Sequence, residues 1–353
     1  EFDLEVLNTN DAPTVATVIT DQSATEDEAF SFTFVEETFN DVDNGDILSY
    51  TATLSDDSAL PAWLTFNTST RNFSGIPTND DVGTITIKVA ASDQSLSSVT
   101  DAFDLTVTNV NDAPTMVNAI GDETATEDEA YSFTFAENTF EDVDEGDSLT
   151  YTATLSDDSS LPAWLTFNIS TRNFSGMPTN DDVTTITIKV KATDQSLSSV
   201  TDEFDLEVSN TNDAPTVATE ITDQSATEDE AFSFTFVEET FNDVDNGDIL
   251  SYTATLSDDS ALPAWLTFNT STRNFSGIPT NDDVGTITIK VAASDQSLSS
   301  VTDAFDLTVT NVNDAPTMVN AIGDETATED EAYSFTFAEN TFEDVDEGDS
   351  LTY

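Results

Sequence analysis

Apolar and polar residues alternate along several short segments of the chain. In residues 30–34 three phenylalanines alternate with Ser and Thr, and in residues 84–89 Ile and Val alternate with Thr and Lys. Residues 103–107 follow the same pattern, with Phe, Leu and Val separated by Asp and Thr. Because successive side chains of a β-strand point to opposite faces, this period of two predicts strands with one face in a core and the other in water.

Shorter apolar runs and turn residues lie between these segments. Further strand candidates are residues 15–19, 47–54, 64–67 and 72–74. The turn residues that separate them are Asn44-Gly45-Asp46, Pro61, Gly75, Pro77 and Asn79-Asp80-Asp81. No segment shows a sustained helical period. About seven short strands in about 100 residues are typical of an all-β, immunoglobulin-like sandwich. We expect Trp63 to belong to its core rather than to form a ligand-stacking platform.

The whole pattern repeats every 101 residues. The sequence Asn-Asp-Ala-Pro returns at residues 10–13, 111–114, 212–215 and 313–316. We therefore expect three complete repeats, at residues 10–110, 111–211 and 212–312. Residues 1–9 would be the end of a preceding repeat, and residues 313–353 the start of a further one. On this reading the chain is a window on a longer array, in which each repeat contacts mainly its neighbours.

Two types of repeat alternate along the array. The first two repeats differ at 24 of 101 positions. Residues 1–151 and 203–353, in contrast, match everywhere except Leu7/Ser209 and Val18/Glu220. The period of the alternation is therefore 202 residues, and its near-identity indicates recent duplication of a two-repeat block.

The composition is strongly acidic, with 71 Asp and Glu against 7 Lys and Arg and a formal net charge of −64. The 24 phenylalanines and 37% hydrophobic residues favour folded domains over a disordered acidic chain. The charge argues against nucleic acid and anionic membrane surfaces as partners and favours cations. Without Cys or His, disulfides and thiol chemistry are excluded. No segment reaches 18 consecutive apolar residues, so we expect no membrane insertion of this part of the chain. Residue 1 does not begin a signal peptide.

Acidic residues gather at the predicted strand ends and at the repeat boundary. The clusters of one repeat are residues 26–28, the acids of 41–46 (sequence DVDNGD), residues 79–81, Asp93 and the connector 111–112. Ca²⁺ prefers six to eight oxygen ligands, several of them carboxylates. The spacing in DVDNGD is similar to an EF-hand loop, although the Glu at its twelfth position and the flanking helices are absent. A single acid is most simply a solvated loop residue, but the repeated set favours bound cations.

The order of motifs in each repeat resembles the dystroglycan-type cadherin-like repeat. The residues that carry this resemblance are TEDEAF, FxDVDxGDxLxYTATL, LPAWLTFN, TRNFSGxPTNDDV, TITIKVxAxDQ and FDLxVxNxNDAP, and they recur along the whole chain. Such repeats occur in large bacterial extracellular proteins and adhesins. The resemblance implies tandem Greek-key cadherin/immunoglobulin-like β-sandwiches joined end to end in a linear rod. It also implies two or three Ca²⁺ at each junction and an extracellular or cell-surface location.

The resemblance also nominates metal ligands at each junction. At each junction, the preceding repeat contributes an acid before its second strand and acids of a later loop. The connector contributes Asn and Asp. The following repeat contributes its Asp-x-Asp pair and the Asp after its penultimate strand. Two departures weaken the transfer, because the usual Leu-Asp-Arg-Glu loop is replaced by residues 79–81 and Ala113 follows the connector Asp. The nominated ligands are Asn10, Asp11, Asp41, Asp43, Asp93, Glu26, Asp81, Asn111, Asp112, Asp142, Asp144, Asp194, Glu127, Asp182, Asn212, Asp213, Asp243, Asp245, Asp295, Glu228, Asp283, Asn313, Asp314, Asp344 and Asp346.

Three classes of function are compatible with these features. The first is a calcium-stiffened spacer, as an extracellular fibre or adhesin stalk, with further copies of the repeat as partners and lateral or end-to-end self-assembly left open. The second is an adhesive module whose loops recognise a glycan or another copy of the chain. The third, a hydrolase with paired carboxylates, is disfavoured because tandem near-identical active sites are unusual, so we expect no enzyme. The two repeat types differ by mild changes such as Asn40/Glu141, which favours the spacer.

Two further motifs have simpler explanations. Glycosylation sequons begin at Asn67 and Asn72 and at their copies 168, 173, 269 and 274, and we interpret them as turn and strand polarity. The threonine ladder of residues 84–86 is similar to an ice-binding face, but one short ladder per repeat is more simply a solvent-facing strand.

Overall fold

The computed structural model describes residues 2–3, 5, 7–43, 45–346 and 348–353. They form two compact units, each described by itself. The first contains residues 1–124, 131–176 and 185–207, and the second contains residues 125–130, 177–184 and 208–353. The division runs through the second repeat, whose segments 125–130 and 177–184 group with the repeat that follows.

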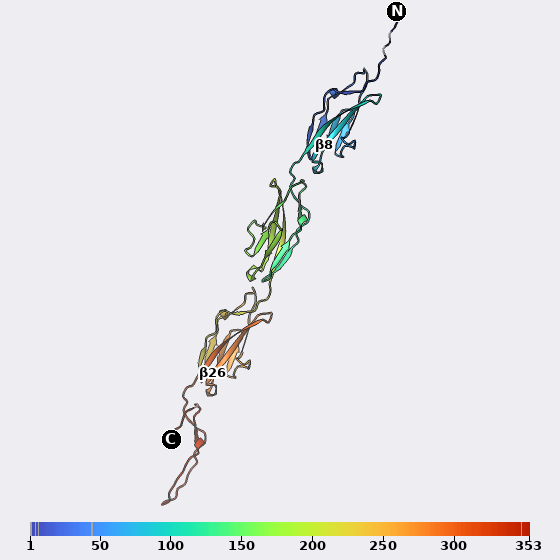
Figure 1. Cartoon of the computed structure of the whole chain (residues 1–353). Helices are drawn as coiled ribbons and strands as arrows, with labels where there is room; N and C mark the ends of the chain where they lie inside the picture. Colours follow the sequence, from blue (N-terminus) through green and yellow to red (C-terminus); the bar gives the residue numbers. More distant parts are fainter. Residues whose placement is uncertain (1, 4, 6, 44, 347) are drawn as a thin grey trace. The chain divides into compact units, whose positions relative to one another are not determined.

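The first repeat is a β-sandwich (Figure 1, blue to cyan). One sheet has the order β2-β9-β8-β5, and a second has the order β3-β7-β6. Strand β2 runs parallel to β9, and the remaining neighbours are antiparallel. The bounds are β1 Thr14–Val15, β2 Gln22–Thr25, β3 Phe30–Thr33, η1 Glu36–Thr38, β4 Phe39–Asn40, β5 Ser49–Leu54, β6 Leu64–Asn67, β7 Asn72–Gly75, η2 Asn79–Asp81, β8 Gly83–Ser92 and β9 Ser98–Thr108.

The other repeats have the same order of elements. The second contains β10 Thr115–Met116, β11 Glu123–Thr126, β12 Tyr131–Thr134, η3 Glu137–Thr139, β13 Phe140–Glu141, β14 Thr150–Leu155, β15 Leu165–Asn168, β16 Asn173–Gly176, η4 Asn180–Asp182, β17 Thr185–Thr193 and β18 Ser199–Ser209. The third contains β19 Thr216–Val217, β20 Gln224–Thr227, β21 Phe232–Thr235, η5 Glu238–Thr240, β22 Phe241–Asn242, β23 Ser251–Leu256, β24 Leu266–Asn269, β25 Asn274–Gly277, η6 Asn281–Asp283, β26 Gly285–Ser294 and β27 Ser300–Thr310. After these come β28 Thr317–Met318, η7 Glu339–Thr341 and β29 Phe342–Glu343.

Alternating side chains build the core of each sandwich. Phe73, Ile87, Val89 and Leu105 are completely buried between the two sheets of the first repeat. Trp63 packs against this core, as the sequence predicted. A methyl group at Gly75 would overlap the Trp63 carbonyl, so the Gly that follows Phe73-Ser74 allows β7 to pass close to the tryptophan.

The structure confirms the all-β prediction and corrects two strand assignments. The alternating segments are β3, β8 and β9. The candidate at residues 15–19 forms only the short β1, which pairs with β4, because beyond it the Asp101 carboxylate accepts the Ile19 N–H at 2.6 Å. Strand β2 was missed, since three of its four residues are polar. Within the described parts of the chain, no helix is both long and apolar enough to cross a membrane.

Candidate metal centres at the repeat junctions

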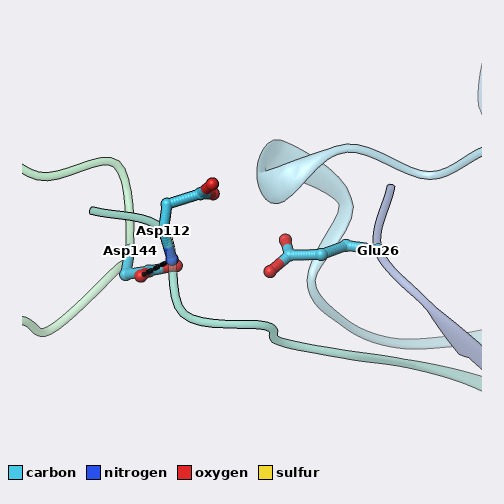
Figure 2. A group of neighbouring side chains, drawn as sticks. All are labelled: Glu26, Asp112 and Asp144. Atoms are coloured by element: carbon cyan, nitrogen blue, oxygen red, sulfur yellow. Dashed lines mark hydrogen bonds between the residues drawn. The ribbon is translucent and has the colours of Figure 1, made fainter. Parts of the chain in front are cut away.

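Three carboxylates from two repeats meet at the first complete junction. Glu26 follows β2 of the first repeat, Asp112 lies in the connector, and Asp144 follows β13 of the second repeat. Figure 2 shows Glu26 facing the other two side chains, and one oxygen of each carboxylate lies within 4.8 Å of the others. Equivalent groups occur at the next two junctions, formed by Glu127, Asp213 and Asp245 and by Glu228, Asp314 and Asp346.

Glu26 is buried with one carboxylate oxygen left without a partner. The residue is only 1% exposed. Its Oε1 accepts the Val110 N–H at 2.5 Å, whereas Oε2 has no hydrogen-bond partner among the described residues. Glu127 and Glu228 are equally buried and have the same unpartnered Oε2. A buried carboxylate oxygen without a hydrogen bond or counter-ion is costly, so these recurring oxygens are candidate ligands for a cation.

The DVD segment supplies further unpartnered oxygens. Asp144 is 6% exposed, and its Oδ2 accepts the Asp112 N–H at 2.8 Å, the bond drawn in Figure 2. Asp142 Oδ1 accepts the Asp144 N–H at 3.0 Å. Asp144 Oδ1 and Asp142 Oδ2 are buried and, in the part of the chain that the structure describes, have no hydrogen-bond partner. Together with Glu26 Oε2, three buried oxygens at one junction are therefore free to bind a cation.

A second acidic group lies beside the first and includes the last acid of the DVDxGD segment, which the sequence analysis counted in an acidic cluster but did not list as a ligand. Oxygens of Asp142, Asp144 and Asp147 lie within 4.8 Å of one another, and in the first repeat Asp41, Asp46 and Asp93 form a comparable group. Asp46 and Asp147 are the last acids of the DVDxGD segments. Their position within that motif was the signal that could have identified them.

The connector asparagines donate hydrogen bonds to aspartate carboxylates of the following repeat. Asn111 Nδ2 donates to Asp194 Oδ2 at 3.0 Å and to the Asp112 carbonyl at 2.7 Å. Asn10 contacts Asp93 in the same way, and this hydrogen bond is the main cause that holds the pKa of Asp93 below its ordinary value. Asn8, which the sequence analysis missed, donates to Asp43 Oδ1 at 2.9 Å and is the first Asn of its NxND motif.

The loop at residues 79–81 forms a short 3₁₀ helix, and its Asn contacts the next repeat. Asp81 Oδ2 accepts the Thr78 N–H and hydroxyl at 3.0 and 2.9 Å, which closes a capping box on η2. Asn79 Nδ2 instead donates across the junction to the Val143 carbonyl. At the next junction Asn180 donates to Asp213 Oδ2 at 2.7 Å. Asp81 and its copies Asp182 and Asp283 as metal ligands stay a prediction.

Burial and nearby carboxylates raise the pKa of two acids at this junction. Burial raises the pKa of Asp112, and the charges of Asp144, Asp27 and Asp142 raise it further. Burial and neighbouring carboxylates also raise the pKa of Asp147. The ion pairs found among the described residues join Arg71, Lys88, Lys189, Arg273 and Lys290 to acids outside these groups. A cation that neutralises the junctions would therefore come from solvent, and oxygen-rich sites of this kind suit Ca²⁺.

Comparison with known proteins identifies each repeat. The family model He_PIG, described as "Putative Ig domain", matches residues 12–108, 113–209 and 214–310. The "Serine-rich adhesin for platelets" of Staphylococcus aureus strain USA300 is 32% identical over 162 residues, which are 46% of this chain and 6% of that protein. In strain MRSA252 the same match spans 11% of the adhesin. This chain therefore corresponds to a small part of the length of these relatives.

Solved structures show the same fold in cadherins. Mouse cadherin-23 EC22–24 superposes with a TM-score of 0.55 at 17% identity, covering 86% of this chain and 100% of that one. The extracellular domain of protocadherin GammaB4 has a TM-score of 0.53 at 16% identity, covering 88% and 52%. These similarities confirm the expected tandem cadherin/Ig-like sandwiches. Because the family model matches three consecutive segments that together cover most of the chain, the protein belongs to the He_PIG family of immunoglobulin-like domains.

Proposed function

We propose that this chain is a calcium-stiffened structural array that forms part of an extracellular adhesin stalk or fibre. The observation that carries the proposal is the buried, unpartnered carboxylate oxygen of Glu26, which faces acids of the next repeat and recurs in Glu127 and Glu228. The similarity to part of a staphylococcal adhesin supports an adhesion-related structural role and a cell-surface location. No catalytic step is needed to explain these residues.

The ligand set supports ions that join consecutive repeats. Glu26 from one repeat would hold one ion together with Asp112 and Asp144. Asp142 and Asp147 would hold a second ion and share Asp144 with the first. When bound, each Ca²⁺ supplies two positive charges where the acids lie closest together. Since the ligands come from both repeats and the connector, occupied sites would restrict rotation about residues 109–114.

The acidic surface outside the junctions would keep such arrays soluble and apart. A repeat such as residues 10–110 carries 17 acids, Arg71 and Lys88, which gives it a formal charge of −15. Extracellular calcium modules bind with dissociation constants of about 10⁻⁴–10⁻³ M, which suits sites that fill outside the cell.

Calorimetric titration of the metal-free 353-residue chain with Ca²⁺ tests the proposal. We expect saturable heat with two or three ions per junction. Asp112→Ala combined with Asp144→Ala should reduce the number of ions bound while the circular dichroism of the sandwiches stays unchanged. The absence of calcium-dependent heat in the unmodified chain would refute the proposal.

A further inference from the structure

A surface pocket lies beside β4 and β5 in the first repeat and is found again in the third. Its volume is about 810 Å³ in the first repeat and about 710 Å³ in the third. The two pockets have the same thirteen lining residues, shifted by 202 positions. These volumes are within the range of small-molecule binding sites in proteins.

The lining of this pocket includes a guanidinium group, that of Arg71, and a phenol, that of Tyr50. The Arg71 side chain is 23% exposed, its Nε is buried, and this atom lacks a hydrogen-bond partner within the described residues. Its terminal nitrogen is 3.6 Å from the Glu36 carboxylate, which is itself largely exposed. Burial raises the pKa of Tyr50, while the Arg71 charge lowers it and the Glu36 charge raises it. All three residues line the pocket.

The remaining wall combines hydroxyl, amide and apolar groups. Ser69 and Asn40 contribute hydrogen-bonding groups, and Ile47 is a large apolar side chain that is 75% exposed at the same pocket. Four carboxylates and one guanidinium line the pocket. One of the carboxylates is that of Asp41, an acid nominated as a junction ligand. This charge excess disfavours anionic ligands. If Ca²⁺ neutralises the junction acids, the remaining charge of the pocket is small, which disfavours a strongly cationic ligand as well.

Some of the differences between the two repeat types fall on the pocket. Five of its thirteen lining positions differ between the first and second repeats, against 24 of 101 positions in the whole repeat. The differing pairs are Glu37/Asn138, Asn40/Glu141, Ile47/Ser148, Ser49/Thr150 and Thr68/Ile169. These five exchanges give the corresponding surface of the second repeat a different lining, whereas the other 19 differences lie elsewhere in the repeat.

We propose that the pocket of the first and third repeats binds a neutral saccharide. The hydroxyls of a sugar can donate to carboxylates such as Glu36 and accept from Arg71 and Asn40, while its C–H faces pack on Tyr50 and Ile47. The second repeat, with a different lining, would bind this ligand weakly or select another. The array would then carry a recognition site once every 202 residues in addition to its structural role.

Exchange of the lining between repeat types provides the test. In the pocket variant, the first repeat receives Glu37→Asn, Asn40→Glu, Ile47→Ser, Ser49→Thr and Thr68→Ile, and the third receives Glu239→Asn, Asn242→Glu, Ile249→Ser, Ser251→Thr and Thr270→Ile. The second repeat already has these residues in the same fold, so the variant should fold normally. The control exchanges other differing positions, on β8 and β9 and their copies, through Ala90→Lys, Ala102→Glu, Thr106→Glu, Ala292→Lys, Ala304→Glu and Thr308→Glu.

The 353-residue chains are screened against immobilised glucan, mannan, xylan and chitin oligosaccharides, sulfated and sialylated oligosaccharides, and lysine-rich peptides. We expect binding to at least one neutral oligosaccharide, and a loss of at least about tenfold in the pocket variant but not in the control. Calcium titration should be the same for all three chains, because the exchanges leave the junction acids in place, so this proposal and the calcium proposal can fail separately. Binding only to anionic sugars or peptides, no binding, or equal binding by the pocket variant would overturn the proposal.

Discussion

Replacement of the buried junction glutamates tests the role of their unpartnered oxygens. In the variant Glu26→Gln, Glu127→Gln and Glu228→Gln, the amide oxygen can still accept the N–H that Glu26 accepts from Val110. The second oxygen becomes an NH₂ group, which cannot bind a cation. The fold should therefore be retained while each junction loses one charged ligand.

The size of the effect follows from the distances at the junction. At the usual Ca–O distance of about 2.4 Å, a divalent ion and a carboxylate attract by about 3.5 kcal/mol with the full screening of bulk water. The repulsion of Glu26 by Asp112 and Asp144 is present with and without the ion, so it cancels from the calcium affinity. Dehydration of the ion on binding offsets part of the attraction, so we expect a loss of at least about tenfold in calcium affinity.

Isothermal titration of the metal-free chain with Ca²⁺ measures this loss. The matched control is Glu28→Gln, Glu129→Gln and Glu230→Gln, which removes the same number of charges from exposed positions two residues further along the same loops. We expect the control to bind calcium within about twofold of the unmodified chain, since exposed charges interact weakly. Equal losses in both variants, or no loss in the first, would refute the reasoning.

Three further predictions concern pH, packing and metal removal. Because burial and neighbouring charges raise the pKa of Asp112, the folded chain disfavours its ionised form. In the presence of a chelator, the contribution of Asp112 to stability should therefore increase as the pH falls through that raised pKa. Calcium should be released over the same range, and calorimetry between pH 7 and pH 4 can check both effects. Gly75→Ala should destabilise the first sandwich by about 1–3 kcal/mol in thermal unfolding, since its methyl group meets the Trp63 carbonyl, whereas Gly121→Ala, with open space around it, should have little effect. Chelation should leave the far-ultraviolet circular dichroism unchanged, because the core residues do not take part in the acidic groups.

The strands with strict alternation could be predicted from the sequence, and one strand could not. Strands β8 and β9 were recognised because one face of each lies against the core and the other in water. Strand β2 has the sequence Gln-Ser-Ala-Thr, in which only Ala24 is buried. Its position depends on parallel pairing with β9, more than 80 residues away, and no local pattern encodes such a contact.

The candidate site was likewise predicted only in part from the sequence. The grouping of Glu26, Asp112 and Asp144 was anticipated through the family resemblance, and the structure brings their carboxylates together. Asp147 was overlooked although it belongs to the same motif. The decisive feature, a carboxylate oxygen buried without a partner, depends on how the connector folds over Glu26, and it is visible only in three dimensions.

Small-angle X-ray scattering of the 353-residue chain tests the central claim most directly. The chain is measured in saturating Ca²⁺ and again after chelation, with circular dichroism recorded in both states. We predict the scattering of a stiff, extended particle in calcium and of a flexible chain of folded beads after chelation. The variant with glutamine at residues 26, 127 and 228 should need a higher calcium concentration to reach the stiff state. Identical scattering with and without calcium would contradict the proposal that metal ions stiffen the junctions.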